Sequence, residues 1–262
     1  HWMPGLPGST PENDLAMTEE LFNNPLYRPD GLKIYPTMVV EGTVLEDWYL
    51  AGKYKPYSDE EMTRLIVCMK RVVPPYVRIS RVLRDIPAEY ITGGLKNSLR
   101  DNIQAQLKNA GLSCKCIRCR EYGHRFRRKL DIGQPILKRL DYEASSGTEI
   151  FLSYEDDYGT LFGLLRLRIQ QESPQGLSGR EKKIALIREL HIFGPELLIG
   201  SQGDEISVQH KGLGRGLLAE AEGIALDEYH LSRVAVLSGI GARAYYQSLG
   251  FRLVSGYMVK IF

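Results

Sequence analysis

The chain has 262 residues, of which 43% are hydrophobic and 25% charged, and its formal net charge is +2. These proportions are typical of a folded globular protein, and the length allows one large domain or two ordinary ones. This net charge is too small to indicate a nucleic-acid partner by itself. Any basic binding site must therefore come from a local cluster of lysine and arginine residues. No apolar run approaches the roughly 20 residues of a membrane-spanning helix. The first eight residues lack the basic start and apolar core of a signal peptide. We therefore expect a cytoplasmic protein with no membrane partner.

The first part of the chain alternates between predicted strands and helices. Residues 33–40 predict one short buried strand and residues 43–50 a short helix. Ser58 followed by Glu61 three residues later predicts a capping box at the start of the next helix. Residues 76–83 predict another strand. Strand–helix–strand order is typical of α/β proteins.

A cysteine cluster follows a predicted helix over residues 97–110. Its members are Cys114, Cys116 and Cys119. A disulfide framework would spread its cysteines along the chain, whereas clustering favours a metal in a reducing compartment. Three neighbouring thiolates are a typical start to a tetrahedral zinc site, and the spacing fits zinc better than an iron–sulfur cluster. The fourth ligand is His124 or a group distant in sequence; the alternative is three reduced thiols without metal. Cys68, on an apolar helical face, is predicted to belong to the core.

A basic run overlaps the cysteine cluster and continues beyond it. Its candidate RNA-binding residues are Arg118, Arg120, Arg125, Arg127, Arg128 and Lys129. Such a run is commonly only a solvated face. Here Tyr122, His124 and Phe126 lie among the arginines, and arginine with aromatic rings suits a phosphate backbone and unstacked bases. We therefore expect contact with RNA, although the sequence does not indicate which residues make it.

The second part of the chain predicts a sheet. Residues 149–155 and 160–169 predict a β-hairpin with its turn at 156–159. Residues 185–192 and 233–237 predict two further strands.

A glycine-rich stretch lies between these two strands. It consists of Gly212, Leu213, Gly214, Arg215 and Gly216, preceded by Lys211. An apolar helical pattern begins at Leu217. Glycines allow a ligand to approach the backbone closely, and the first N–H groups of a helix are unpaired and partly positive, so the stretch is a candidate diphosphate site. By itself the pattern is weak, because it also fits a simple turn. Lys211 and Arg215 either add positive charge to this diphosphate site or are solvated loop residues without a binding role.

The order of strand 185–192, glycine-rich loop, strand 233–237 and the segment Tyr246-Gln-Ser-Leu-Gly-Phe251 resembles the acetyl-CoA core of the GNAT N-acetyltransferase superfamily. The resemblance implies that the acetyl-CoA arm lies along Glu189, Leu190, His191 and Ile192, and that Gly212 to Gly216 hold the pyrophosphate. It also implies that Tyr246 lies at the CoA sulfur or thioester.

Two pairs of residues are the candidates for proton transfer. Tyrosine is protonated at neutral pH and can donate to a departing thiolate, which makes Tyr246 and Tyr245 the catalytic candidates. Adjacent helical residues diverge by about 100°, so the two hydroxyls cannot share one role. Tyr245 is expected either to point toward a cleft between domains or to belong to the core. Glu189 and His191 are the candidate bases, although a strand histidine is more often a satisfied core residue.

A second resemblance covers nearly the whole chain. Its segments are residues 1–9, 33–43, 84–88, 114–121, 188–191 and 256–260. They resemble late barrel strands of a radical-SAM domain and, specifically, the family of Elongator catalytic subunits, which join such a domain to a GNAT domain and modify the tRNA wobble uridine. The radical-SAM cysteine motif, C-x3-C-x2-C, is not in the sequence. We therefore expect that the front half of the radical domain is missing and that this chain alone does not cleave SAM.

The resulting expectation is an α/β protein with three parts. A partial radical-SAM (β/α) barrel occupies residues 1–96, a basic zinc-bearing linker 97–130, and a GNAT domain with a mixed central sheet 131–262. The resemblance implies a tRNA uridine(34) acetyltransferase that uses acetyl-CoA to form carboxymethyluridine, with tRNA-stimulated acetyl-CoA hydrolysis. Zinc is the expected metal, and SAM and a 4Fe–4S cluster belong to the full-length protein only.

The expected partners are the anticodon loop of tRNA and either accessory Elongator-type subunits or a second copy of the chain. Two alternatives stay open: a GNAT-type N-acetyltransferase of lysine or small amines, and a non-catalytic RNA-binding module.

Overall fold

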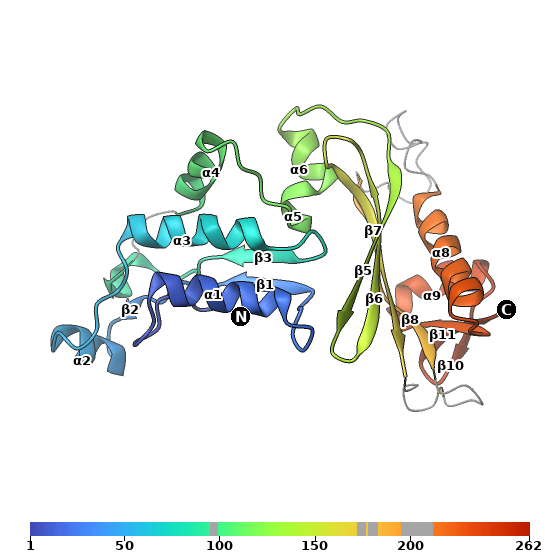
Figure 1. Cartoon of the computed structure of the whole chain (residues 1–262), viewed down its shortest axis with the longest axis horizontal. Helices are drawn as coiled ribbons and strands as arrows, with labels where there is room; N and C mark the ends of the chain where they lie inside the picture. The colour runs from blue at the N-terminus through green and yellow to red at the C-terminus, as the bar shows by residue number, and fades with distance from the viewer. Residues whose placement is uncertain (95–98, 172–176, 178–182, 195–211) are drawn as a thin grey trace. The chain divides into compact units, whose positions relative to one another are not determined.

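The computed structural model describes residues 1–94, 99–171, 177, 183–194 and 212–262. The chain forms two compact units, His1–Cys119 and Arg120–Phe262 (Figure 1). Among the described residues, no helix combines the length and apolar character that crossing a bilayer requires.

The first unit alternates short strands with helices. Its elements are α1 (Pro11–Asn23), β1 (Gly31–Ile34), β2 (Val39–Val40), α2 (Val44–Leu50), α3 (Asp59–Val72), β3 (Arg78–Val82), the 3-10 turn η1 (Ala88–Tyr90), β4 (Ile91–Gly93), α4 (Leu99–Asn109) and α5 (Ile117–Arg120). β1 pairs in parallel with β3, and β2 pairs antiparallel with β4. The predicted capping box of α3 is confirmed: the Ser58 hydroxyl accepts the N–H of Glu61 while the Glu61 carboxylate accepts the N–H of Ser58.

Two features of the first unit differ from the sequence prediction. The single strand predicted over residues 33–40 is wrong, because β1 and β2 lie in different sheets. Pro36 separates them and has no N–H to continue a ladder. Helix α1 was not predicted, although Thr10 caps it and Pro11 occupies a first-turn position, both of which are start signals.

The second unit is built on one mixed sheet. Its elements are α6 (Tyr122–Arg127), β5 (Ile136–Ala144), β6 (Gly147–Glu155), β7 (Leu161–Gln170), β8 (Ile184–Ile192), α8 (Leu213–Gly223), the π-helical turn η2 (Ile224–Glu228), β9 (Arg233–Val236), the 3-10 turn η3 (Ile240–Ala242), α9 (Arg243–Ser248), β10 (Arg252–Val254) and β11 (Tyr257–Ile261). The strand order is β10-β11-β9-β8-β7-β6-β5, in which the β8–β9 pair is parallel and the other pairs are antiparallel. The predicted mixed central sheet and the β6–β7 hairpin are therefore confirmed.

Helix α8 covers one face of this sheet (Figure 1). Its buried residues Leu217, Leu218 and Ala221 pack against the inward side chains of β6 and β7, among them Leu152 and Leu165. Each such side chain contributes roughly 1.5–3 kcal/mol when it is removed from water. This packing fixes the position of the first turn of α8 beside the sheet.

The parallel β8–β9 pair is short. Its last matched residues are Ile187 and Val236, and the register between β7 and β8 shifts at Arg188. Residues 189–192 of β8 keep their partners in β7 but lie beyond the ladder with β9. Among the described residues, no strand pairs with that side of residues 189–192, so a ligand can pair with the backbone there.

Candidate functional site

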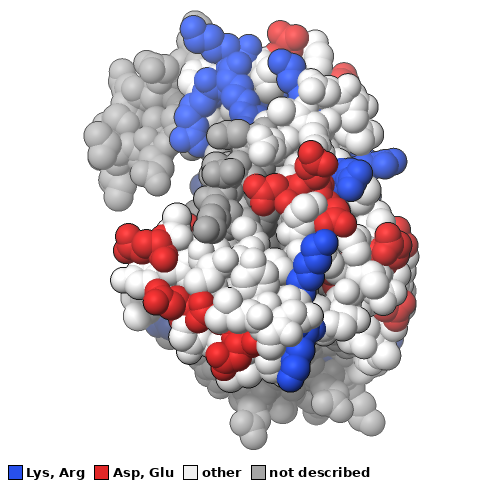
Figure 2. Space-filling model, turned by 90° about the vertical axis from the view of Figure 1, so that its left-hand side faces the viewer, with Lys and Arg blue, Asp and Glu red and all other residues white. Residues whose placement is uncertain are grey.

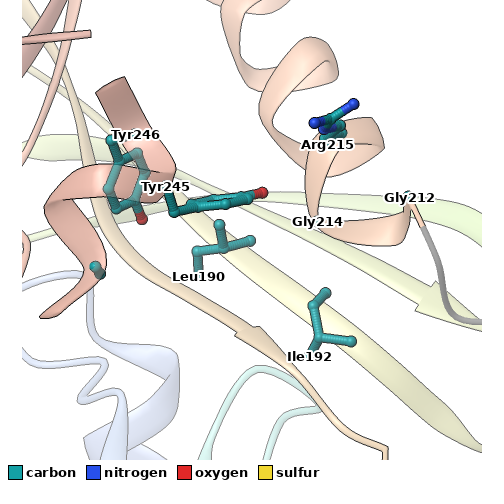
Figure 3. Close-up of a pocket in the computed structure, with 8 residues that line it drawn as sticks. Leu190, Ile192, Gly212, Gly214, Arg215, Tyr245 and Tyr246 are labelled. Carbon is teal, nitrogen blue, oxygen red and sulfur yellow. The ribbon is translucent and has the colours of Figure 1, made fainter. Parts of the chain in front are cut away.

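A cavity of about 410 Å³ opens where β8, the start of α8 and α9 meet (Figure 3). Its lining residues are Leu190, Ile192, Gly212, Gly214, Arg215, Ala242, Tyr245 and Tyr246. The elements that contribute them are separated by long stretches of sequence and are brought together by the sheet and by α8. Six of the predicted acetyl-CoA residues line this cavity, namely Leu190, Ile192, Gly212, Gly214, Arg215 and Tyr246, and so does the second catalytic candidate, Tyr245. Lys211 lies outside the described residues.

The three glycines of the loop have different structural roles. Gly212 caps α8 with φ +100°, a left-handed conformation that side chains disfavour. A Cβ on Gly214 would lie 3.1 Å from the Tyr245 hydroxyl, so its bare backbone allows α8 and α9 to approach each other. A Cβ on Gly216 would lie 2.5 Å from the hydroxyl of Tyr154 on β6. Gly216 therefore serves the packing of α8 on the sheet and does not line the cavity.

The first turn of α8 faces the cavity with its positive end. The N–H of Gly216 makes the first helical hydrogen bond, to the carbonyl oxygen of Gly212 at 2.8 Å. The preceding N–H groups, those of Leu213, Gly214 and Arg215, have no partner within the helix. Together with the Arg215 side chain they favour an anion at this end of the cavity.

The two tyrosines occupy different positions, as their adjacent places on a helix predict. Tyr246 is 6% exposed and packs edge-on against Phe251, yet it still lines the cavity. Tyr245 is 37% exposed, and Figure 3 shows its hydroxyl extending toward the first turn of α8. Burial raises the pKa of both phenols, and the charge of Arg215 only partly opposes this at Tyr245. Both are protonated at neutral pH and can act as donors.

The candidate bases Glu189 and His191 lie on β8 but do not line the cavity. The Glu189 carboxylate accepts a hydrogen bond from Nε of the buried Arg166 at 2.7 Å. The His191 ring stacks with Phe193, with centroids 4.3 Å apart. The alternation of side chains along a strand places their neighbours Leu190 and Ile192 in the cavity instead.

The cysteine cluster belongs to the first unit. The three sulfur atoms of Cys114, Cys116 and Cys119 lie within 4.8 Å of one another. Hydrogen bonds among the three thiols lower the pKa of Cys116 and raise that of Cys114. Three convergent sulfur ligands suit a soft divalent metal such as zinc. His124 lies in the other unit, where its Nε2 is 3.5 Å from the Glu121 carboxylate, and it is not among the clustered ligands found in the described part of the chain.

Two of the predicted RNA-binding arginines are engaged within the protein. Arg118 donates to the backbone carbonyl of Ser80 at 2.7 Å. Arg120 forms an ion pair with Glu155 at 2.6 Å, in which both side chains are nearly buried. Because Glu155 already balances the charge of Arg120, this guanidinium is not available to bind a ligand.

The other four candidates lie further along the run. Arg125 and Arg127 each donate to a nearby backbone carbonyl, at 3.1 and 3.0 Å, and Arg128 and Lys129 are exposed. Figure 2 shows a group of lysine and arginine side chains near the top of the visible face, with an acidic side chain beside them and further basic and acidic side chains spread over the rest of that face.

Sequence reasoning missed one charged residue at the cysteine cluster. Lys70 of α3 is buried, and its Nζ lies 3.9 Å from Sγ of Cys119. The available signal was its position four residues after Ile66 and three before Val73, which places it on the buried face of the helix.

Comparison with known proteins agrees with this architecture. Residues 29–109 match the model of the Radical_SAM C-terminal domain. The chain is 59% identical over 261 residues to the tRNA uridine(34) acetyltransferase of Dehalococcoides mccartyi, covering 99% of this chain and 57% of that protein. It is 41% identical over 266 residues to human Elongator complex protein 3, covering 100% of this chain and 48% of that protein.

A solved structure aligns over the same range. The archaeal Methanocaldococcus infernus Elp3, with residues 1–46 deleted, superposes with a TM-score of 0.89 and 44% identity over 99% of this chain and 62% of that one. The chain belongs to the Elongator complex protein 3 family. It spans about half the length of the curated relatives it matches. The radical-SAM part and the mixed-sheet part predicted from the sequence both belong to this family's fold.

Proposed function

We propose that this chain is the acetyl-CoA-binding part of a tRNA uridine(34) acetyltransferase. The observation that carries the proposal is the cavity bounded by β8, the first turn of α8 and the two tyrosines of α9. It combines an anion site at the first turn of α8, beside the Tyr245 hydroxyl, with the buried phenol of Tyr246, and this combination suits a ligand with a diphosphate and a thioester. The names of the relatives support the same activity.

In this proposal acetyl-CoA is bound mainly by backbone groups. The amides of the pantetheine arm pair with the free edge of β8 at residues 189–192, in the manner of an added strand. The diphosphate accepts N–H groups of Leu213, Gly214 and Arg215 at the start of α8. Leu190 and Ile192 supply apolar contact for the arm.

The cavity supports cleavage of the thioester. A water molecule attacks the acetyl carbonyl and loses a proton to the solvent, the C–S bond breaks, and the departing thiolate takes a proton from a donor that the solvent reprotonates, which gives acetate and CoA. We assign the donation of that proton to Tyr246, because its phenol is protonated and lines the cavity. Water activation is assigned to neither Glu189 nor His191, because Glu189 is paired with Arg166 and neither side chain lines the cavity.

The remaining assignments extend the proposal to the whole protein. We propose a structural zinc ion at Cys114, Cys116 and Cys119, and contact of Arg127, Arg128 and Lys129 with the anticodon loop of tRNA. SAM and a 4Fe–4S cluster would supply radical chemistry in the full-length protein, through cysteines outside this sequence. The domain limits at residues 96 and 130, a cytoplasmic location, and either accessory subunits or a second copy also stay proposals.

Binding and turnover are measured separately to test the proposal. Isothermal titration of the chain with acetyl-CoA should give saturable binding, and S-acetylpantetheine, which lacks the diphosphate, should bind at least about tenfold more weakly. Acetyl-CoA hydrolysis should rise when tRNA is added. Failure to bind acetyl-CoA at millimolar concentration would overturn the proposal. Acetylation of a lysine peptide at a rate above hydrolysis would favour an ordinary N-acetyltransferase instead.

A further inference from the structure

Lys70 is a buried cation in the middle of an apolar helix face. Its helix, α3, also buries Ile66 and Met69, the C-cap residue Val73 is buried as well, and Lys70 itself is 8% exposed. Lysine is almost never this buried unless it is paired, because removing an ammonium ion from water costs several kcal/mol. The position therefore requires a negative partner.

The partners that the structure provides are sulfur atoms. Nζ of Lys70 lies 3.9 Å from Sγ of Cys119 and also interacts with the other two cysteines of the cluster. Within the described ranges, no carboxylate forms an ion pair with Lys70. A neutral thiol gives an ammonium ion little compensation, whereas a thiolate gives a full opposite charge. The presence of Lys70 is thus an independent indication that the cysteine cluster is anionic.

The charges balance when a divalent metal is bound. Three thiolates carry −3 and Zn²⁺ carries +2, so a zinc ion held by Cys114, Cys116 and Cys119 leaves a net charge of −1. One ammonium ion cancels this charge. A fourth thiolate would leave the site negative again, so a neutral fourth ligand such as water or imidazole fits the arrangement.

We propose that Lys70 is the charge-balancing residue of a three-cysteine zinc site, which it stabilises without binding the metal. This inference rests on the zinc site of the proposed function. Lys70 acts from outside the ligand shell, in the way that other outer-shell partners tune a metal site. It has no part in the acetyl-CoA cavity, which belongs to the other unit.

The matched variants are K70M and R71M in the whole chain. Both remove one positive charge from α3, but Arg71 is exposed and Lys70 is buried. Zinc affinity is measured by competition with a chromophoric chelator, and coordination by the absorption of the Co²⁺-substituted protein. We expect K70M to weaken zinc binding about 10–100-fold and R71M to leave it unchanged. The Co²⁺ spectrum of K70M should keep the bands of tetrahedral thiolate coordination, since all three ligands remain.

A thermal readout separates this role from simple packing. The metal-free K70M protein should be no less stable than the metal-free wild type, because an ammonium ion without a full counter-charge is removed from the interior. The rise in melting temperature on adding zinc should be smaller in K70M. If K70M does not fold, K70Q is measured instead, with the same expected loss of affinity. If the variant binds zinc as tightly as the wild type, the proposed role of Lys70 is wrong but the zinc site stands. If the wild-type chain binds neither Zn²⁺ nor Co²⁺, both the role of Lys70 and the proposed zinc site are wrong.

Discussion

The contact between Gly216 of α8 and Tyr154 of β6 leads to a quantitative prediction. In Gly216→Ala the new Cβ would lie 2.5 Å from the Tyr154 hydroxyl oxygen, where ordinary contact begins at 3.4 Å. The tyrosine or the helix must therefore move by almost 1 Å. Such overpacking costs about 1–3 kcal/mol, while alanine gains about 1 kcal/mol over glycine inside a helix. We expect a net loss of about 1 kcal/mol in the free energy of unfolding.

The same geometry predicts how the loss is relieved. Tyr154→Phe removes the hydroxyl, and the nearest remaining ring atoms lie at 3.4 and 3.5 Å, which is ordinary contact. In that background Gly216→Ala should be neutral or stabilising by up to about 1 kcal/mol. The double-mutant cycle should thus show a coupling of about 1–2 kcal/mol. Gly223→Ala is the matched control, because Gly223 has helical φ −59° and a Cβ there would meet its nearest atom at 3.9 Å.

Urea unfolding followed by far-UV circular dichroism measures these free energies. Both tryptophans, Trp2 and Trp48, lie in the first unit, so their fluorescence reports that unit separately. A Gly216→Ala protein as stable as the wild type would refute the reasoning. So would an equal cost of Gly216→Ala with and without the Tyr154 hydroxyl.

Three further predictions concern the cavity, the pH dependence and the basic run. Tyr246→Phe should lower acetyl-CoA turnover at least about tenfold with little change in acetyl-CoA affinity, measured by hydrolysis and titration; unchanged turnover would remove its role as donor. Burial raises the pKa of Asp156, but hydrogen bonds to its carboxylate outweigh this effect and lower the pKa overall. The ionised carboxylate therefore stabilises the fold above about pH 4. This stabilisation is lost as the pH falls through the lowered folded-state pKa. The stability gap between wild type and Asp156→Asn should therefore be constant from neutral pH down to about pH 5 and close below it, and a gap that widens in acid would contradict the assignment. Arg120→Ala should destabilise the fold by about 1–3 kcal/mol through the loss of its ion pair. Arg128→Ala should leave stability unchanged and weaken RNA binding in a gel-shift assay. The reverse pattern would contradict a structural role for Arg120 and an RNA-binding role for Arg128.

Local signals in the sequence predicted much of the fold. The capping box at Ser58 and Glu61 and the alternation of residues 149–169 depend on neighbours within a few positions, so the sequence contains them completely. The split of residues 33–40 depends on which strand each half meets, and that partner is remote. Propensity and pattern do not specify it, because β-structure is decided by pairing and burial rather than by the segment alone.

The cavity was predictable in its parts but not in its arrangement. The glycine-rich loop and the tyrosine segment were identified from their residue types, and the structure brings Gly214 and Tyr245 together. The different role of Gly216 was not predictable, because nothing near it in the sequence shows that Tyr154 lies opposite. The same limit applies to Arg120, whose charge suggested RNA until Glu155 was found beside it.

Lys70 shows most clearly what a sequence reveals about a buried charge and what it leaves open. The helical spacing of Ile66, Lys70 and Val73 indicates that the ammonium group points inward, and elementary electrostatics then requires a negative partner. The sequence offers many carboxylates and four thiols as that partner, and one that the structure brings to Lys70, Cys119, is 49 residues away. Because burial is a property of one helix and pairing is a property of two segments, the first can be inferred from periodicity, while the second needs the fold. The choice of thiols over carboxylates has a chemical consequence, since a thiol is a full counter-charge for Lys70 only when it is deprotonated, and a bound metal keeps it so.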